Sequence, residues 1–179
     1  MPPRSVAQAF ADHLNSLLNR TVTDARLTVI GDPSHPARFA LACLRGTTPI
    51  SFALHGSSVR LLVVQALQVT GERCQTLTYQ YRLSLGEDKQ SWLIRWEYFR
   101  HRPTPAYPYP LAHVHVNADL LPGGADAALA KLHIPTRRVP LELVLWHAIA
   151  EWGVDPKRDD WQTLLEDSID EFERRRLAP

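Results

Sequence analysis

Alternation of apolar and polar residues dominates the middle of the chain, whereas helical spacing of apolar residues is confined to its two ends. Apolar residues at helical spacing predict a first amphipathic helix. It is expected to begin at Ser5, where the sequence has a capping-box pattern, and to end near Asn19. Helical spacing returns after Pro140, ends near Gly153, and resumes after Asp155-Pro156. The two ends of the chain are therefore predicted to be helical.

Short runs rich in β-branched or alternating residues predict strands through the intervening part of the chain. Turn-forming glycine, proline and aspartate residues separate these runs. The most regular run, from Leu77 to Leu85, has an apolar residue at every second position, which is typical of a half-buried strand. A short helix over 125–132 is predicted after the Gly123-Gly124 break. The predicted strands cover residues 26–30, 38–45, 50–54, 59–70, 77–85, 92–99 and 113–117.

Hairpin-spaced strands between helical ends predict an α+β fold. We expect a single domain in which an antiparallel sheet of five or more strands packs against N- and C-terminal helices, because 179 residues suffice for one well-buried core. The α+β domain is expected over 1–153, with a C-terminal amphipathic helix over 154–179 as part of it or as an appendage.

The composition is that of an ordinary soluble protein, with 45% hydrophobic and 22% charged residues. No apolar run approaches the roughly 20 residues of a membrane span, and the N-terminus does not resemble a signal peptide. We therefore expect a cytoplasmic protein with no membrane partner. A net charge of +1 argues against a basic surface over the whole protein.

Basic residues and histidines nevertheless gather between residues 95 and 138. This segment holds six Lys or Arg residues against three Asp or Glu residues, an excess of +3, and four histidines besides. Moderate attraction for phosphates or acidic surfaces follows, although an ordinary solvated charged face explains the pattern equally well. The candidate substrate-binding residues are Arg82, Arg100, Arg102, Asn117, Arg137 and Arg138.

Residues that can transfer protons occupy alternate positions of two predicted strands. His113 and His115 would project to the same side, about 7 Å apart along the strand. If the two strands are neighbours, Arg95 and Glu97 would lie on the same polar face of the sheet. Paired histidines suit acid and base roles, Arg95 would stabilise developing charge, and Glu97 would orient a histidine, with His101 in support. These five residues are the candidate catalytic residues.

The paired histidines also permit two other interpretations. Neutral imidazoles at this separation are common metal ligands, and further ligands would come from His101, His133, Glu97 or Asp119, among which no spacing selects. Alternatively, the histidines are simply tolerated on an exposed strand face. We expect acid–base chemistry with no metal and no cofactor. Activity should then follow a bell-shaped pH profile and survive chelation, whereas a metal enzyme would lose activity to a chelator.

Several of these residues, taken in order, resemble the TumE-like toxins of bacterial toxin–antitoxin modules. Those proteins carry a Tyr-x-Tyr strand, an Arg-Trp-acid strand, a His-Pro element and a cluster of histidines preceded by proline and followed by a helix. Here the similar segments are 79–82, 94–97, 101–103 and 109–115, within a match over about 59–153. The matching positions are Arg95, Trp96, Glu97, His101, Pro103, Pro110, His113 and His115.

The resemblance implies a small α+β toxin, encoded beside an antitoxin protein, with nuclease-like activity. The leading hypothesis is a toxin-like ribonuclease that cleaves RNA without a metal, with His113 and His115 as acid and base and Arg95 as the phosphate stabiliser. Two alternatives stay open. One is a non-catalytic protein that binds a ligand or partner on the same face, and the other is a metal-dependent hydrolase with His113 and His115 as ligands.

Overall fold

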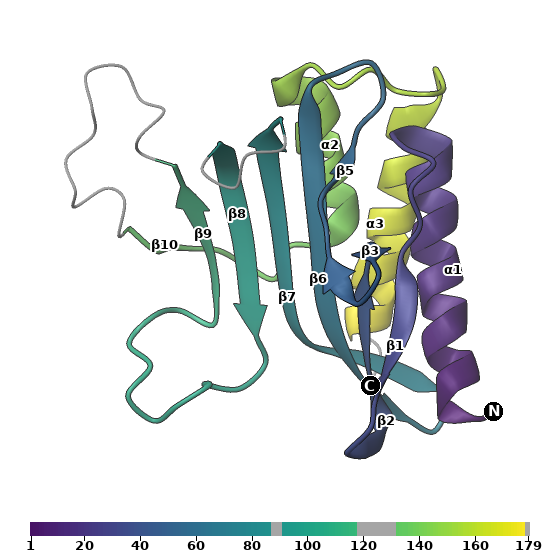
Figure 1. The fold of residues 1–179 in the computed structure, drawn as a ribbon, viewed down its shortest axis with the longest axis vertical. Helices are drawn as coiled ribbons and strands as arrows, with labels where there is room; N and C mark the ends of the chain where they lie inside the picture. The colour runs from purple at the N-terminus through teal and green to yellow at the C-terminus, as the bar shows by residue number, and fades with distance from the viewer. Residues whose placement is uncertain (87–90, 118–131, 178–179) are drawn as a thin grey trace.

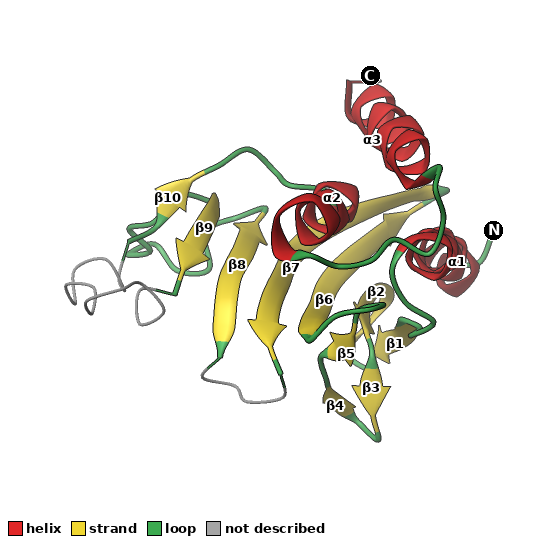
Figure 2. Ribbon diagram, turned by 90° about the horizontal axis from the view of Figure 1, so that it is seen from above, coloured by secondary structure: helices red, strands yellow, loops and turns green. Residues whose placement is uncertain are grey.

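The computed structural model describes residues 1–86, 91–117 and 132–177. Within these ranges the chain forms one large antiparallel sheet of eight strands with three helices against one of its faces (Figure 1 and Figure 2). The prediction of an α+β fold with an antiparallel sheet of five or more strands is confirmed. The predicted helix over 125–132, the Gly123-Gly124 break and Asp119 lie outside the described residues.

The sheet runs in the order β1-β2-β6-β7-β8-β9-β10, with β5 paired to β6, and a separate hairpin pairs β3 with β4. Its centre is the long hairpin of β6 and β7, whose strands pair along their whole length. The helices are α1 (Pro3–Thr21), α2 (Leu141–Trp152) and α3 (Trp161–Leu177). The strands are β1 (Thr28–Asp32), β2 (His35–Ala42), β3 (Leu44–Arg45), β4 (Thr48–Pro49), β5 (Phe52–Ala53), β6 (Val59–Thr70), β7 (Arg73–Leu85), β8 (Trp92–Phe99), β9 (Ala112–Val116) and β10 (Ile134–Pro135).

The hydrophobic core lies between the helices and one face of the sheet. Because side chains alternate along a strand, the cross-strand row of Val63, Tyr81, Trp96 and Val114 points to this face. All four are buried. The helices supply the other half of the core, with Ala11, Leu14 and Leu18 from α1, Val144, Leu145 and Ala148 from α2, and Leu165 from α3.

The first helix begins differently from the sequence prediction. α1 starts at Pro3, with Pro2 as its N-cap and without a side-chain hydrogen bond to the cap. The expected capping box at Ser5 is therefore wrong, since Ser5 lies inside the first turn. Proline at the start of a helix needs no backbone donor, so the two prolines can begin the helix without that serine. The end of α2 is as predicted, with Gly153 as its C-cap at a φ of 66°.

The other face of strands β7 to β9 carries the polar residues. The register sets Gln80 opposite Glu97 and Arg82 opposite Arg95 between β7 and β8. It sets Glu97 opposite His113 between β8 and β9. We refer to this surface, turned away from the helices, as the polar face. Its members on β7 to β9 are Thr78, Gln80, Arg82, Arg95, Glu97, Phe99, His113 and His115.

Candidate functional site

The antiparallel pairing of β8 with β9 brings the proposed catalytic residues together. Arg95 lies opposite His115, and Glu97 lies opposite His113. The four side chains consequently share the polar face, as the alternation in the sequence predicts. The shared face does not test their catalytic roles, which stay a proposal.

The two histidines are buried, and this corrects the expectation of a solvent-facing strand. His113 is 0% exposed and His115 is 5% exposed. The rings of Tyr109, from the segment between β8 and β9, and of His133 lie against them. The ring of Tyr109 stacks on His133 with centroids 3.5 Å apart, and its centroid is 6.5 Å from that of His113. This contact could not be predicted from the sequence, because proline-rich connectors have no periodicity.

A hydrogen bond to the backbone orients the ring of His113. Its Nδ1 lies 2.7 Å from the carbonyl oxygen of Pro110. A carbonyl oxygen can only accept, so Nδ1 carries a proton and donates it. In a neutral imidazole the other nitrogen, Nε2, then presents a lone pair. That Nε2 lies 3.2 Å from Oε2 of Glu97, which is itself an acceptor when ionised.

His115 points at the same carboxylate oxygen. Its Nε2 is 3.3 Å from Oε2 of Glu97, and this buried nitrogen makes no hydrogen bond. Burial lowers the pKa of His115 to about 4, with a further lowering by the charge of Arg95 that Glu97 partly opposes. The imidazole of His115 is therefore neutral near pH 7. Two histidine nitrogens and a carboxylate oxygen thus meet around one point.

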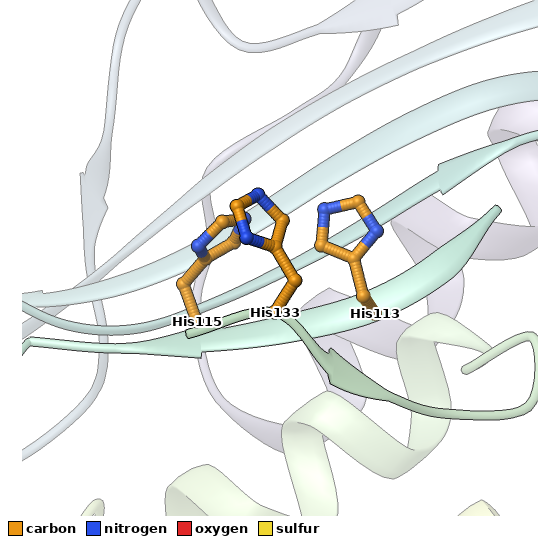
Figure 3. A group of neighbouring side chains, drawn as sticks. All are labelled: His113, His115 and His133. Carbon is orange, nitrogen blue, oxygen red and sulfur yellow. The ribbon is translucent and has the colours of Figure 1, made fainter. Parts of the chain in front are cut away.

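His133 completes the cluster from the next strand. β10 pairs with β9 so that Ile134 lies opposite Val114, and continuing this register by one residue sets His133 opposite His115. The metal-ligating nitrogens of His113, His115 and His133 all lie within 4.8 Å of one another. Figure 3 shows the three imidazole rings grouped together. The sequence offered His133 only as one of four possible extra ligands, because no spacing links it to the histidine pair.

The second oxygen of the Glu97 carboxylate is held from the other side. Arg95 Nε lies 3.0 Å from Oε1, and Gln80 donates a hydrogen bond of 3.2 Å to the same oxygen. Burial and the nearby Glu97 raise the pKa of the Tyr107 phenol, which therefore keeps its proton near the site. These contacts fix the carboxylate with Oε2 turned to the histidines.

A pocket of about 180 Å³ opens beside Glu97 on the polar face. The other residues that line it are Val64, Thr78, Tyr79, Gln80 and Phe99. None of the three histidines lines this pocket, so the carboxylate lies between the pocket and the histidine cluster. A small molecule in the pocket would meet Glu97 first.

The remaining candidate residues lie apart from the cluster. His101 is exposed. Arg100 and Arg138 both donate hydrogen bonds to Thr76. Of the other proposed substrate-binding residues, Arg102 donates to the Tyr107 carbonyl, Asn117 donates to the Trp92 carbonyl, Arg137 is exposed, and Arg82 lies beside Arg95.

No family model, no curated protein and no solved structure matches the chain. The resemblance to the TumE-like toxins therefore stays a prediction. Among the helices of the described residues, none combines the length and the apolar character that crossing a membrane requires.

Proposed function

We propose that this protein is a metal-dependent hydrolase in which His113, His115 and His133 hold a divalent cation, with Zn²⁺ the best suited. Glu97 holds the water bound to that ion and takes its proton. The observation that carries the proposal is the convergence of three histidine nitrogens within 4.8 Å, two of them facing one carboxylate oxygen. Three imidazoles with one open position are the ligand set of a catalytic zinc centre.

Hydrogen bonding in the cluster supports a cation rather than a plain polar network. Nδ1 of His113 donates to the Pro110 carbonyl, so its Nε2 is left to face Glu97 Oε2, and His115 Nε2 makes no hydrogen bond although it is buried. Acceptors that face one another in a buried site repel unless a proton or a cation lies between them. A single cation would satisfy all of them at once.

The distances agree with this interpretation. Ligands of a tetrahedral ion bound at about 2.0–2.1 Å lie about 3.3 Å from one another. Oε2 of Glu97 is 3.2 Å from His113 Nε2 and 3.3 Å from His115 Nε2. The carboxylate oxygen is therefore at the spacing of a ligand beside such an ion, and also close enough to accept the proton of a water bound to it. The Pro110 carbonyl that fixes His113 is the kind of outer partner that ligand histidines usually have.

The chemistry follows from the position of Glu97. A zinc-bound water loses its proton near neutral pH. An ion held there would supply a hydroxide for attack on an ester beside the cluster, and Glu97 would take up the proton and pass it to the leaving oxygen as its bond to the substrate breaks. Arg95 and Gln80 hold Oε1 so that Oε2 stays turned to the cation.

Zinc uptake and metal-dependent hydrolysis test this proposal together. We expect metal-free protein to bind one equivalent of Zn²⁺ in a calorimetric titration and to hydrolyse bis(p-nitrophenyl) phosphate only when loaded. His133→Ala should weaken zinc binding by more than tenfold, since even changes in outer partners cost about 10- to 100-fold. His35→Ala, a matched change of an exposed histidine at the far side of the sheet, should bind as the wild type does. A wild type that takes up no zinc would refute the proposal.

The second candidate is the metal-independent ribonuclease that the resemblance implies, a cytoplasmic toxin with an antitoxin partner. One observation favours it: the chain from the Pro110 carbonyl through His113 to Glu97 would hold a protonated imidazole beside Arg95. Burial of both histidines counts against it, because an RNA phosphate must reach their nitrogens. RNA cleavage that survives chelation with a bell-shaped pH profile would establish this alternative. Growth arrest on expression, rescued by His113→Ala or His115→Ala, would support it further.

A further inference from the structure

We propose that Arg82 and Arg95 form an anion-binding subsite beside the histidine cluster, and that it receives the phosphate group of a phosphate-ester substrate. Its part in catalysis rests on the proposed hydrolase function. The binding of phosphate does not, because it needs only the two guanidinium groups. The subsite therefore names a substrate class and can be tested without the metal.

The two arginines are direct cross-strand neighbours. Arg82 of β7 lies opposite Arg95 of β8, and both belong to the polar face. Like charges directly opposite each other destabilise a sheet. Burial, and to a smaller extent the charge of Arg95, lowers the pKa of Arg82. An anion bound between the two guanidinium groups would turn this repulsion into attraction.

Both arginines also have N–H donors that are not used in hydrogen bonds. Nε of Arg82 and Nε of Arg95 are both buried without a hydrogen bond. Arg95 has a carboxylate nearby, at 3.0 Å in Glu97, and its guanidinium lies 5.5 Å from the ring centroid of Trp92. Within the described part of the chain, the guanidinium of Arg82 has neither an ion pair nor a hydrogen bond. Of the two guanidinium groups, only that of Arg95 has a carboxylate partner among the described residues, and this carboxylate also faces the histidines.

The position of the subsite indicates what it binds. The register sets Arg82 opposite Arg95 and Arg95 opposite His115, so these three residues form one row across the polar face. Guanidinium groups bind phosphate through paired N–H donors. A phosphate held by both arginines would have a further oxygen free to face the histidine end of the row. A carboxylate has only two oxygens and could not engage both arginines and the cluster in this way.

Phosphate binding to the metal-free protein tests the subsite. We expect inorganic phosphate to bind saturably in a calorimetric titration at low salt, and acetate to bind at least about tenfold more weakly. Arg82→Gln should weaken phosphate binding by at least about tenfold, and Arg82→Lys, which keeps the charge but loses the fork, should be intermediate. Arg38→Gln removes the same charge from an exposed position on β2 and should bind phosphate as the wild type does. Removing an unpaired half-buried charge at Arg82 should leave folding intact, which melting curves check.

The outcomes separate the subsite from the metal centre. Zinc uptake without saturable phosphate binding would reject the subsite and leave the metal centre standing. Phosphate binding that Arg82→Gln does not weaken would also reject it. Acetate binding as tight as phosphate binding would reject the assignment to phosphate. Phosphate binding that depends on Arg82, in a protein that takes up no zinc, would support the subsite and refute the metal centre.

Discussion

At the scale of single residues, Glu97 decides how the site works. Its carboxylate is fixed by Arg95 and Gln80 on one oxygen and faces His113 and His115 with the other. Two roles fit these contacts, that of a fourth ligand and that of a base for an ion-bound water. They differ in what happens when the carboxylate is replaced by an amide, which keeps the shape but cannot take up a proton.

Glu97→Gln should therefore keep zinc binding and lose hydrolysis. Removal of a general base lowers turnover by about 10²- to 10⁴-fold, and we expect a loss in this range with zinc affinity within about tenfold of the wild type. Initial rates and a zinc titration on the same preparation measure both quantities. Glu72→Gln, an exposed carboxylate, should change neither. Loss of zinc binding in Glu97→Gln would make the carboxylate a ligand instead of a base.

His113 also contributes to stability, in contrast to what a solvent-facing strand would imply. Its ring is 0% exposed and donates to the Pro110 carbonyl, so His113→Ala leaves a cavity and an unpaired carbonyl. Such changes cost about 1–3 kcal/mol. His35→Ala, whose side chain is 53% exposed, should change the free energy of unfolding by less than about 0.5 kcal/mol. Urea unfolding of the metal-free proteins measures the difference, and equal stabilities would show that burial of His113 is unimportant.

The sequence predicts only part of this site. Alternation alone set Arg95, Glu97, His113 and His115 on one face, because a slip of one residue in the register would bury charge in the core. Burial of the histidines could not be predicted, since it depends on Tyr109 and on the path of a segment without periodicity. The contribution of His133 depends on the pairing of a two-residue strand, β10, which has no detectable pattern in the sequence.

At the scale of elements, a buried polar contact joins the three helices. Ser168 of α3 donates a hydrogen bond of 2.7 Å to Glu142 of α2, and Nε2 of His13 in α1 lies 3.3 Å from the Ser168 hydroxyl oxygen. Burial by itself would raise the pKa of Glu142, but the His13 imidazole 4.0 Å away and the hydrogen bond from Ser168 outweigh it and hold the pKa below its usual 4.5. The carboxylate is therefore ionised between the helices at neutral pH.

This contact should make stability depend on acid in a defined direction. The pKa of Glu142 is lower in the folded state, so its contribution is complete above about pH 4.5 and is lost as the pH falls through the folded pKa. Glu142→Gln should be less stable than the wild type at pH 7 by about 1–3 kcal/mol, and the difference should narrow below pH 4.5. Glu151→Gln, an exposed position on the same helix, should behave as the wild type throughout. Denaturant unfolding at several pH values measures the difference in the free energy of unfolding between the wild type and Glu142→Gln. A difference that does not narrow in acid would contradict this assignment.

At the scale of the whole molecule, the turn before β6 is packed against the connection between α2 and α3. The His55 amide donates to Val22 after α1, and the Asp155 amide donates to the His55 carbonyl. Gly56 has a φ of 61°, and a Cβ there would lie 2.0 Å from Oδ2 of Asp155. Sheet and helices thus meet at a point that has no room for a side chain.

Gly56→Ala should consequently destabilise the fold more than an equivalent change elsewhere. Gly46 has nearly the same φ, 63°, but no atom within 4 Å of its Cβ position, so Gly46→Ala measures the backbone strain alone. That strain is about 1–2 kcal/mol, and Gly56→Ala should exceed it clearly because Asp155 must move. Thermal unfolding of the two variants gives the comparison. Equal losses in melting temperature would mean that the contact with Asp155 relaxes freely.

The fold class was accessible from the sequence because two kinds of periodicity are separated along the chain. Helical spacing at both ends and alternation between them suffice to predict helices against an antiparallel sheet. The order of the strands was not accessible. It places β9 beside β8 and β10 beside β9, and both pairings join segments separated by long connectors. The site depends on these pairings, which is why its residues could be proposed but not assembled.

X-ray absorption at the zinc edge of the loaded protein tests the central claim most directly. The fine structure reports how many imidazole rings bind the ion and at what distance, independently of any substrate. We predict three imidazole nitrogens at about 2.0–2.1 Å in the wild type, two in His133→Ala, and three in the His35→Ala control. A spectrum without imidazole scattering, or one that His133→Ala leaves unchanged, would contradict the metal centre.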